Sequence, residues 1–397
     1  MREMKDSGVA WIGEIPKEWK ILPNKYLMKK AKSICESYNG EDILSLSMKG
    51  VVVRDLNSGG KMPLSFDGYQ YLKPGNLLMC LFDIDVTPRC IGLIRNNGLS
   101  SPAYSQFSLS NFAFNEYYYY YYLMLDNSKT LYHLAKNLRH SLTEEQLGMI
   151  STAVPPLSIQ HQIATYLDQK CTQIDALITN QQKQIEKLKA YKQSLITETV
   201  TKGLNPDVSM KDSGDSFIGV MPEHWNVAKL GMLFDFLGGY AYNSDSYTSE
   251  SDNQVIRIGN VKSGYMALEN NPVYISDEIA SATDKFRISP GSILFTMTGT
   301  KGKRDYFFTH LVAEKDCKGK KLFLNQRVGC FIPKESIDAG YYNYLLKENR
   351  ILDAIFVYET GTANQGNLGI ESIRRTKVQL PSKDEQVKIR EYLDNRC

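Results

Sequence analysis

The chain has 397 residues, of which 42% are hydrophobic, and its formal net charge at pH 7 is +3. This length and composition can bury two domain-sized cores, and no apolar run approaches the roughly 20 residues that a membrane-spanning helix needs. The mildly basic charge permits nucleic-acid binding but falls short of the strongly basic balance, with a pI above about 9, that is typical of it.

The beginning of the chain is repeated near its middle. Residues 4–19 read MKDSGVAWIGEIPKEW, and residues 210–225 read MKDSGDSFIGVMPEHW. A match of this length indicates an internal duplication, and its period is that of a whole domain rather than of a solenoid repeat. Two copies of one domain suggest two copies of one function.

The duplication continues toward the C-terminus. Pairs of equivalent residues are expected to be Pro74 with Pro290, Gln106 with Gln326, Tyr122 with Tyr344, and Cys171 with Cys397. The separation grows along these pairs, from 206 at the start to 216, 220, 222 and 226. Small loop insertions leave this pattern when the order of elements is kept. Between these positions the copies share little, so their interiors have diverged.

Each copy contains short β-rich runs and becomes helical near its end. Runs with strand composition, bounded by Gly, Pro, Asn and Ser, are VVVRDL, NLLMCLF and CIGLI in the first copy and QVIRIGNV, SILFTMTG and VGCFIP in the second. Helices are predicted over 116–138 and 339–356. Six consecutive tyrosines at 117–122 could stack on nucleic-acid bases. A helix that packs its tyrosines against a sheet is the favoured interpretation, because the second copy keeps the helix without the full run.

A long helix is predicted over 158–202, between the two copies. The segment contains no glycine or proline and is rich in Gln, Lys, Leu, Ile and Ala. Ser158 is the expected N-cap after two prolines, and Gly203 supplies the stop. At 1.5 Å per residue, the helix would be a rod about 65 Å long.

An apolar stripe with alternating spacings of four and three runs along this helix. Its positions are Leu167, Cys171, Ile174, Ile178, Gln181, Ile185, Leu188, Lys192 and Leu195. This spacing is typical of a coiled-coil seam, so the helix is expected to need a partner helix, with Gln181 and Lys192 setting register at some cost in stability. The alternative is an ordinary core helix lying across one domain, which the length and the narrow stripe argue against.

Basic residues in the interior loops are the candidates for contact with a polyanion. Flexible lysine and arginine side chains suit phosphate contacts, and arginine can also read guanine edges. The candidates are Arg54, Lys61, Arg89 and Arg95 in the first copy and Lys262, Lys301, Lys303, Arg304, Lys320 and Lys321 in the second. Taken singly, each is more readily explained as a solvated surface charge. The glycine-flanked cluster at 301–304 stands out from the rest.

No catalytic or metal-binding pattern is found in the sequence. There is no P-loop, no HExxH motif and no glycine-rich cofactor fingerprint after a strand, and the five histidines lack metal-ligand spacing. The seven cysteines form no CxxC pair, so reduced thiols in a cytoplasmic protein are expected rather than disulfides or a zinc site.

These features together resemble the specificity subunit of Type I restriction-modification enzymes. The resemblance is carried by the repeated opening with its Ile-Gly, proline and tryptophan, by PPLSIQHQIATYLD at 155–168, and by the long helix that follows, and it runs from residue 4 to residue 397. It implies two variable target-recognition domains, each reading one half of an asymmetric bipartite site on double-stranded DNA. Helices between them would set the spacing and dock methyltransferase subunits.

The resemblance also implies a division of labour. S-adenosylmethionine chemistry would lie on the methyltransferase subunits, and ATP hydrolysis and cleavage, with magnesium, on a motor-nuclease subunit. This chain would then hold no cofactor and be no enzyme. The diverged interiors predict two different half-sites, although composition does not reveal the bases.

The expected fold class is α+β, with two related mixed α/β target-recognition domains joined by a long coiled-coil-type helix. The predicted boundaries are 1–157 for the first domain, 158–203 for the spacer helix, 204–381 for the second domain and 382–397 for the start of a second spacer helix.

One departure from the family pattern concerns this second spacer helix, which should follow YLDNRC, whereas the sequence ends at Cys397. The helix stripe would then find its partner in another copy of the chain, in another half-subunit, or not at all. A C-terminally truncated, recombined or silent specificity cassette, active only on association with another copy, is the alternative interpretation. Two other classes remain open: a catalytic protein, such as a duplicated nuclease or a methyltransferase fused to its reader, and a scaffold whose domains bind proteins.

Overall fold

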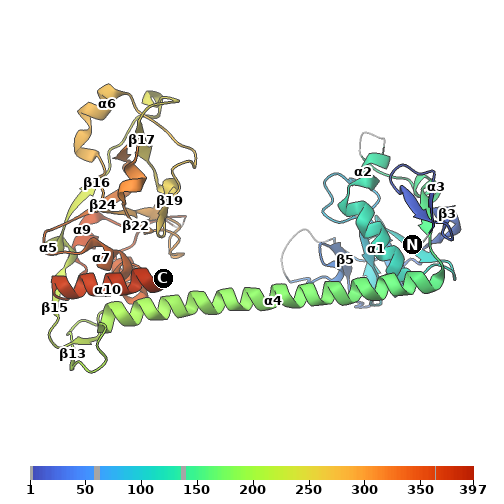
Figure 1. Ribbon diagram of the computed structural model, residues 1–397, viewed down its shortest axis with the longest axis horizontal. Helices are drawn as coiled ribbons and strands as arrows, with labels where there is room; N and C mark the ends of the chain where they lie inside the picture. The colour runs from blue at the N-terminus through green and yellow to red at the C-terminus, as the bar shows by residue number, and fades with distance from the viewer. Residues whose placement is uncertain (1–2, 58–62, 136–139, 363) are drawn as a thin grey trace. The chain divides into compact units, whose positions relative to one another are not determined.

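The computed structural model describes residues 3–57, 63–135, 140–362 and 364–397 (Figure 1). The chain forms two compact units, Met1–Gln181 and Gln182–Cys397. The dividing point lies inside the long helix α4 (Leu157–Lys202), so each unit includes one part of it. Within the described part of the chain, no helix is both long enough and apolar enough to cross a membrane.

The first unit is built on a four-stranded antiparallel sheet with the order β4-β11-β8-β9. These strands are β4 (Met28–Ala31), β8 (Leu77–Met79), β9 (Ile91–Leu93) and β11 (Ser105–Leu109). Helix α1 (Asn115–Asn127) packs against β9. The other elements are β1 (Met4–Asp6), β2 (Glu14–Pro16), β3 (Lys20–Pro23), the 3-10 helix η1 (Asn24–Tyr26), β5 (Leu44–Ser47), β6 (Gly50–Val53), β7 (Gln70–Leu72), β10 (Gly98–Ser100), α2 (Thr130–Leu134), α3 (Glu144–Met149) and β12 (Ser151–Val154).

The second unit repeats this plan with the sheet order β16-β24-β20-β22, again antiparallel. These strands are β16 (Phe234–Gly238), β20 (Ile293–Thr296), β22 (Thr309–Leu311) and β24 (Val328–Pro333). The other strands are β13 (Met210–Asp212), β14 (Val220–Pro222), β15 (Asn226–Lys229), β17 (Asn253–Ile256), β18 (Val261–Lys262), β19 (Tyr265–Met266), β21 (Thr298–Gly299), β23 (Lys321–Leu324), β25 (Thr360–Thr362), β26 (Gln365–Asn367) and β27 (Lys377–Leu380). The helices are α5 (Leu230–Leu233), α6 (Asp277–Ala282), α7 (Ala339–Leu345), α8 (Asn349–Phe356), α9 (Ile370–Arg375), α10 (Lys383–Arg396) and the 3-10 helices η2 (Ser244–Ser246), η3 (Ile258–Asn260), η4 (Asp284–Phe286) and η5 (Glu314–Cys317).

The outer elements of the two units match as well. Strand β1 pairs with β2 as β13 pairs with β14, and β3 pairs with β12 as β15 pairs with β27. The turn glycines of the repeated opening share one backbone conformation, with φ of 71° at both Gly8 and Gly214. Only glycine adopts this left-handed region without strain. The predicted duplication and α+β fold class are therefore confirmed, and every β-rich run named from the sequence contains a strand.

Two of the expected residue equivalences are wrong. In the first sheet Gln106 lies opposite Leu78, whereas in the second sheet Cys330 lies opposite Leu294. The partner of Gln106 in the repeat is thus Cys330, since Gln326 is exposed and precedes β24. Gln326 lies only four residues before Cys330 and gives a false match in the sequence.

The expected equivalence of Tyr122 with Tyr344 is also wrong, by two residues. Tyr118 donates a hydrogen bond to the Ala153 carbonyl on β12, and Tyr342 donates one to the Gln379 carbonyl at the equivalent position on β27. Tyr342 is therefore equivalent to Tyr118, a separation of 224, and Tyr344 is equivalent to Tyr120 rather than to Tyr122. A uniform run of tyrosines cannot fix its own register in a sequence comparison.

The run itself has a structural role. Tyr117, Tyr118 and Tyr122 are buried in the core of the first unit, which confirms the packing interpretation over base stacking for these rings. The helix predicted over 116–138 is interrupted after α1 by Lys129, whose φ is 58°, and residues 136–138 lie outside the described residues. The helix predicted over 339–356 is likewise divided, into α7 and α8.

Helix α4 begins one residue before the expected cap. The carbonyl of Pro156 accepts the first helical hydrogen bonds, from Ile159 and Gln160, so Ser158 is not the N-cap. Proline suits this position because it has no N–H to satisfy and its φ is already helical. At the equivalent place in the second copy, Ser382 does cap α10, its hydroxyl accepting from the Glu385 N–H. Gly203, with φ of 80°, ends α4 as predicted.

A buried glutamine holds each of these helices to its domain. The Gln160 amide donates to the Pro155 carbonyl at 2.9 Å, and its carbonyl accepts from the Phe114 N–H at 2.7 Å. Gln386 repeats both bonds, to the Pro381 carbonyl at 2.9 Å and from the Asp338 N–H at 2.8 Å. Both side chains are fully buried, so the start of α4 is fixed against the start of α1 and the start of α10 against the start of α7.

Replacing Gln160 with alanine is expected to destabilise the first unit by roughly 2–4 kcal/mol, because a buried N–H and a buried carbonyl lose their partner. Urea unfolding of the full chain, followed by tryptophan fluorescence and circular dichroism, measures the effect. Gln162→Ala, an exposed position on the same turn, is the matched control and should change stability little. Equal effects of the two substitutions would contradict the role given to Gln160.

Candidate nucleic-acid interface

The basic candidates of the first unit do not form one cluster. Arg89 and Arg95 lie beyond opposite ends of β9, so the strand itself holds them apart. Arg54 follows β6 and is half-buried, and Lys61 lies outside the described residues. Of the three candidates that the structure describes, Arg95 is the exposed one.

The cluster at 301–304 in the second unit is fixed rather than flexible. Glu359 accepts hydrogen bonds from the Tyr306 hydroxyl at 2.7 Å and from the Gly302 N–H. The Lys301 ammonium donates to the Gly361 carbonyl at 2.9 Å, and Arg304 forms an ion pair with Asp353. The loop is therefore held in place, because the neighbouring segment before and within β25 supplies a carboxylate and a carbonyl that bind it.

These contacts separate the cations of the loop by availability. Lys301 and Arg304 are engaged by the protein, and the guanidinium of Arg304 also lies 5.7 Å from the centre of the Phe356 ring. Lys303 is exposed and forms no ion pair with any residue that the structure describes. It is the cation of this loop best placed to meet an external phosphate.

The remaining candidates also differ in their partners. Lys320 pairs with Glu269 at 3.1 Å, although the Glu269 side chain is itself 83% exposed. Lys321, at the start of β23, is exposed. Lys262 lies on the β18–β19 hairpin, directly before Ser263 and Gly264.

This hairpin and the 301–304 loop meet at a cavity of about 600 Å³ in the second unit, here called the basic pocket. Ser263, Gly264 and Arg304 line one side of it. Three further lysines complete its lining: Lys189, Lys192 and Lys347. The structure thus brings two of the predicted basic segments together and adds cations that the sequence analysis either missed or, for Lys192, assigned to the helix stripe.

Lys347 is the most constrained of these lysines. Burial, together with the nearby charge of Lys192, lowers the pKa of Lys347 from its ordinary value of 10.5 to about 8. With the separation of 224, its equivalent in the first unit is Leu123, which packs against the apolar core. The sequence signal for this residue is a lysine at a position that faces the core in the other copy. It can be recognised only when the register of the duplication is correct.

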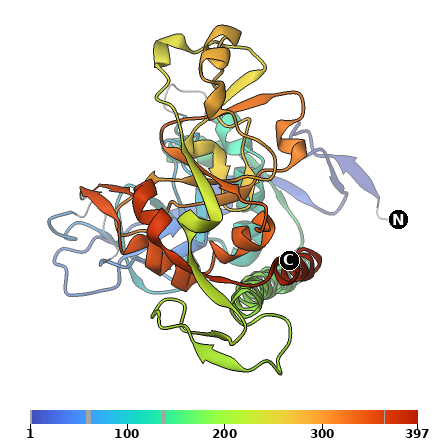
Figure 2. The same cartoon turned by 90° about the vertical axis from the view of Figure 1, so that its left-hand side faces the viewer.

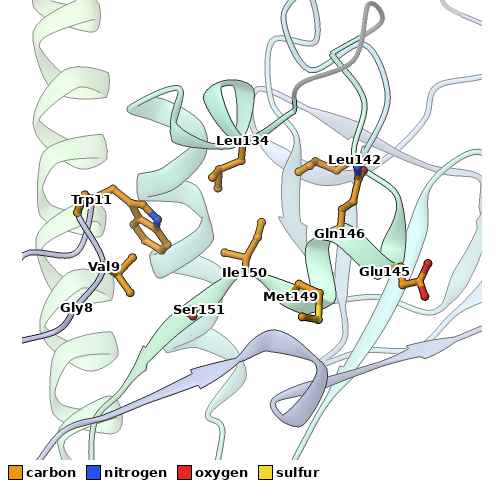
Figure 3. A pocket seen from close by; sticks show the side chains of 11 residues that line it. Gly8, Val9, Trp11, Leu134, Leu142, Glu145, Gln146, Met149, Ile150 and Ser151 are labelled. Carbon is orange, nitrogen blue, oxygen red and sulfur yellow. The ribbon is translucent and has the colours of Figure 1, made fainter.

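An apolar cavity of about 770 Å³ lies in the first unit, between the loop after β1 and the segment around α3 (Figure 3). Trp11, Leu134 and Ile150 face it, and Glu145 is the one ionisable residue among the described residues that line it. In the second unit the equivalents of Val9 and Ser151 are Asp215 and Lys377, whose side chains form an ion pair at 3.5 Å. The described residues that line the cavity form no arrangement of acids, bases and nucleophiles. No cluster of three or more His, Cys, Asp or Glu side chains suited to a metal ion occurs in the described part of the chain.

The apolar stripe of α4 is exposed over most of its length. Leu167 and Leu195 are half-buried near the two ends, whereas residues 169–192, including Gln181, are all exposed. The exposed fractions of Ile178 and Leu188 reach 62% and 65%, and Ile174 and Ile185 are exposed as well. The interpretation of α4 as an ordinary core helix is therefore wrong.

The last turns of α4 do have a helix beside them. In the second unit α10 lies against them and runs in the opposite direction (Figures 1 and 2). Ile196 and Val200 of α4 share a core with Ile389 and Leu393 of α10, and the Lys192 ammonium donates to the Cys397 carbonyl at 2.8 Å. Antiparallel packing of the two predicted spacer helices is thus observed over these turns.

A family model described as Type I restriction modification DNA specificity domain matches residues 96–187 and 222–396. The MjaVIII type I restriction enzyme specificity subunit from Methanocaldococcus jannaschii is 28% identical over 249 residues, which are 62% of this chain and 54% of that protein. The chain thus spans about half the length of this relative.

Two solved structures share the fold. A chain from work described as the structural basis underlying complex assembly and conformational transition of the type I R-M system has a TM-score of 0.68 at 13% identity. The HsdS subunit from Thermoanaerobacter tengcongensis has a TM-score of 0.55 at 12% identity. Each similarity covers 96% of this chain and 90% of the other.

Replacing Lys347 with methionine is expected to stabilise the protein at pH 7 by up to about 3 kcal/mol, since a pKa lowered by this much reflects the cost of holding the charged form in the folded state. Between pH 8 and 10.5 the unfolded chain retains the proton that folded Lys347 has lost, so the stability of the parent rises with pH. The difference in the free energy of unfolding between the variant and the parent should therefore become smaller across this pH range. Urea unfolding at several pH values measures it, with the exposed Lys187→Met as control. A difference independent of pH would argue against the assignment.

Proposed function

The chain belongs to the family of type I restriction modification DNA specificity domains, and on this basis we propose that it is the DNA-reading subunit of a type I restriction-modification system. Each unit reads one half of an asymmetric bipartite site on double-stranded DNA. The proposal rests on one observation: both units of this chain have the same sheet plan and matching outer strands, whereas their interiors have diverged, and the chain belongs to this family. A repeated frame positions two readers, and different interiors let them read different bases.

Contact with DNA falls to the exposed cations of the interior segments. Lys303, Lys321 and Arg95 are exposed, and Lys262 lies on a hairpin close to the 301–304 loop. Such residues supply phosphate contacts that position a protein on a duplex, and arginine adds readout of guanine. Lys301 and Arg304 act mainly by fixing the loop that presents Lys303.

Helix α4 sets the spacing between the half-sites and docks the methyltransferase subunits. Its exposed stripe offers a partner helix an apolar surface at coiled-coil spacing. The chemistry lies on the partners, with S-adenosylmethionine on the methyltransferase subunits and ATP and magnesium on the motor-nuclease subunit. The specificity subunits named among the relatives support this non-catalytic role.

Mapping of methylated adenines across the genome, in cells with and without the gene, tests the proposed reading function. One bipartite motif with two unlike halves is expected to be methylated only when the gene is present. A cell that makes the intact chain together with its methyltransferase subunits, yet shows no gene-dependent motif, would contradict the proposal.

Within that experiment Lys303→Ala tests the loop. Binding of the complex to its mapped site should weaken, and the slope of log affinity against log salt should fall by roughly 0.9, the contribution of about one phosphate contact. Lys334→Ala, an exposed lysine on the same unit, is the matched control.

The exposed stripe also favours association with a second copy, which would make the chain a cassette that acts only when paired. Sedimentation of the purified chain at micromolar concentration should show concentration-dependent dimers. Ile178→Glu should abolish them by placing a charge in the seam, whereas Ala176→Glu, on the opposite face of the helix, should not. A parent chain that stays soluble and strictly monomeric would refute association through α4.

A further inference from the structure

The basic pocket of the second unit concentrates positive charge in an apolar surrounding. Lys189 and Lys192 enter it from α4, and Lys347 enters from the segment that follows α7. Its walls include Phe307, Leu352 and Phe356, and the Leu346 side chain is fully buried beside them. A cavity of about 600 Å³ with apolar walls and a few convergent polar groups has the size and character of a small-ligand site.

The acidic side chains around the pocket are already engaged elsewhere. Asp353 pairs with Arg304, and Asp394 accepts from the Tyr344 hydroxyl and pairs with Arg390. Glu348 accepts from the Ile351 N–H. Among the described residues no carboxylate side chain forms an ion pair with any of the three lysines. The Lys192 ammonium has one protein partner, the Cys397 carbonyl.

Such a cluster is costly without an anion. Like charges that share a pocket disfavour one another, and burial raises the free energy of the charged form of Lys347, whereas Lys189 and Lys192 are exposed. The lysines nevertheless converge there from two separate segments of the chain. The neighbouring Asn343 adds a buried side-chain oxygen with no hydrogen-bond partner among the described residues. A ligand that brings negative charge and a donor would satisfy both features.

We propose that the basic pocket binds a phosphate group through Lys189, Lys192 and Lys347. A phosphate carries up to two negative charges and several acceptor oxygens, which suit three ammonium groups better than a single carboxylate does. The aromatic walls accept a ring attached to the phosphate, and Asn343 accepts a hydroxyl or amine of that ligand.

The first unit has Leu123 at the position of Lys347, so among the described residues it offers no counterpart of this lysine. The phosphate can come from two sources: the DNA backbone, which rests on the proposed function, or a free phosphorylated molecule such as a nucleotide, which does not.

The full chain with Lys347→Met tests the inference. Methionine keeps the apolar stem, so the variant is expected to fold. Inorganic phosphate or AMP, at constant ionic strength, should raise the midpoint of thermal unfolding of the parent to a saturating value, and calorimetry should show one site per chain. The variant should lose this response, whereas Lys187→Met, an exposed position on the opposite face of α4, should keep it.

A second arm distinguishes the sources. If the DNA backbone supplies the phosphate, Lys347→Met lowers the slope of log affinity against log salt for the mapped site by roughly 0.9, and AMP competes with DNA. If a free nucleotide supplies it, the slope is unchanged and only nucleotide binding is lost. An unchanged response of Lys347→Met to phosphate, AMP and DNA overturns the inference while leaving the proposed function intact. Selective binding of an acidic peptide in place of phosphate would overturn it as well.

Discussion

The structure depends on the way helices α4 and α10 are each held to their domain. A buried glutamine near the start of each helix, Gln160 or Gln386, donates to the carbonyl of the proline that precedes the helix. Its side-chain carbonyl accepts from the N–H at the start of α1 or α7. Both copies therefore make the same pair of bonds. About two turns further along each helix, Asp168 accepts a hydrogen bond from Tyr120 and Asp394 accepts one from Tyr344. Desolvation, and the hydrogen bond to the carboxylate, raise the pKa of both tyrosines, so both hydroxyls keep their protons for these bonds. The direction of each helix relative to its domain is therefore fixed by polar bonds, which demand specific geometry and of which those of the buried glutamines are shielded from water, in addition to apolar contact.

This shared frame explains which parts of the fold the sequence could predict. The repeated opening, the proline-bounded helix and the β-rich runs are local signals, and each marks an element that the structure contains. The register of the duplication could not be read in the same way, because Gln326 and the tyrosine run offer false matches. Hydrogen bonds across the sheet and to β12 and β27 decide the register, and these join residues far apart in the chain.

The candidate site was predictable only in part for a related reason. Composition identified the cations at 301–304, but it could not show that Gly361 and Asp353 would engage Lys301 and Arg304, since those partners lie 60 and 49 residues away. Lys189 and Lys192 were read as parts of one helix and Lys347 as part of another. Their convergence follows from the packing of α4 against α7 and α10, for which sequence spacing gives no indication.

The two copies show how one frame can serve different tasks. Where the first unit has Val9 and Ser151, the second has the ion pair of Asp215 with Lys377, and where the first has Leu123, the second has Lys347. These changes leave the strand order untouched, because they concern side chains at the margin of the core rather than the sheet. Lys192 has more than one structural role. It occupies a seam position of α4, lines the basic pocket and donates a hydrogen bond to the Cys397 carbonyl. One side chain thus belongs both to the exposed stripe of α4 and to the pocket lining, so a substitution at this position changes both surfaces together.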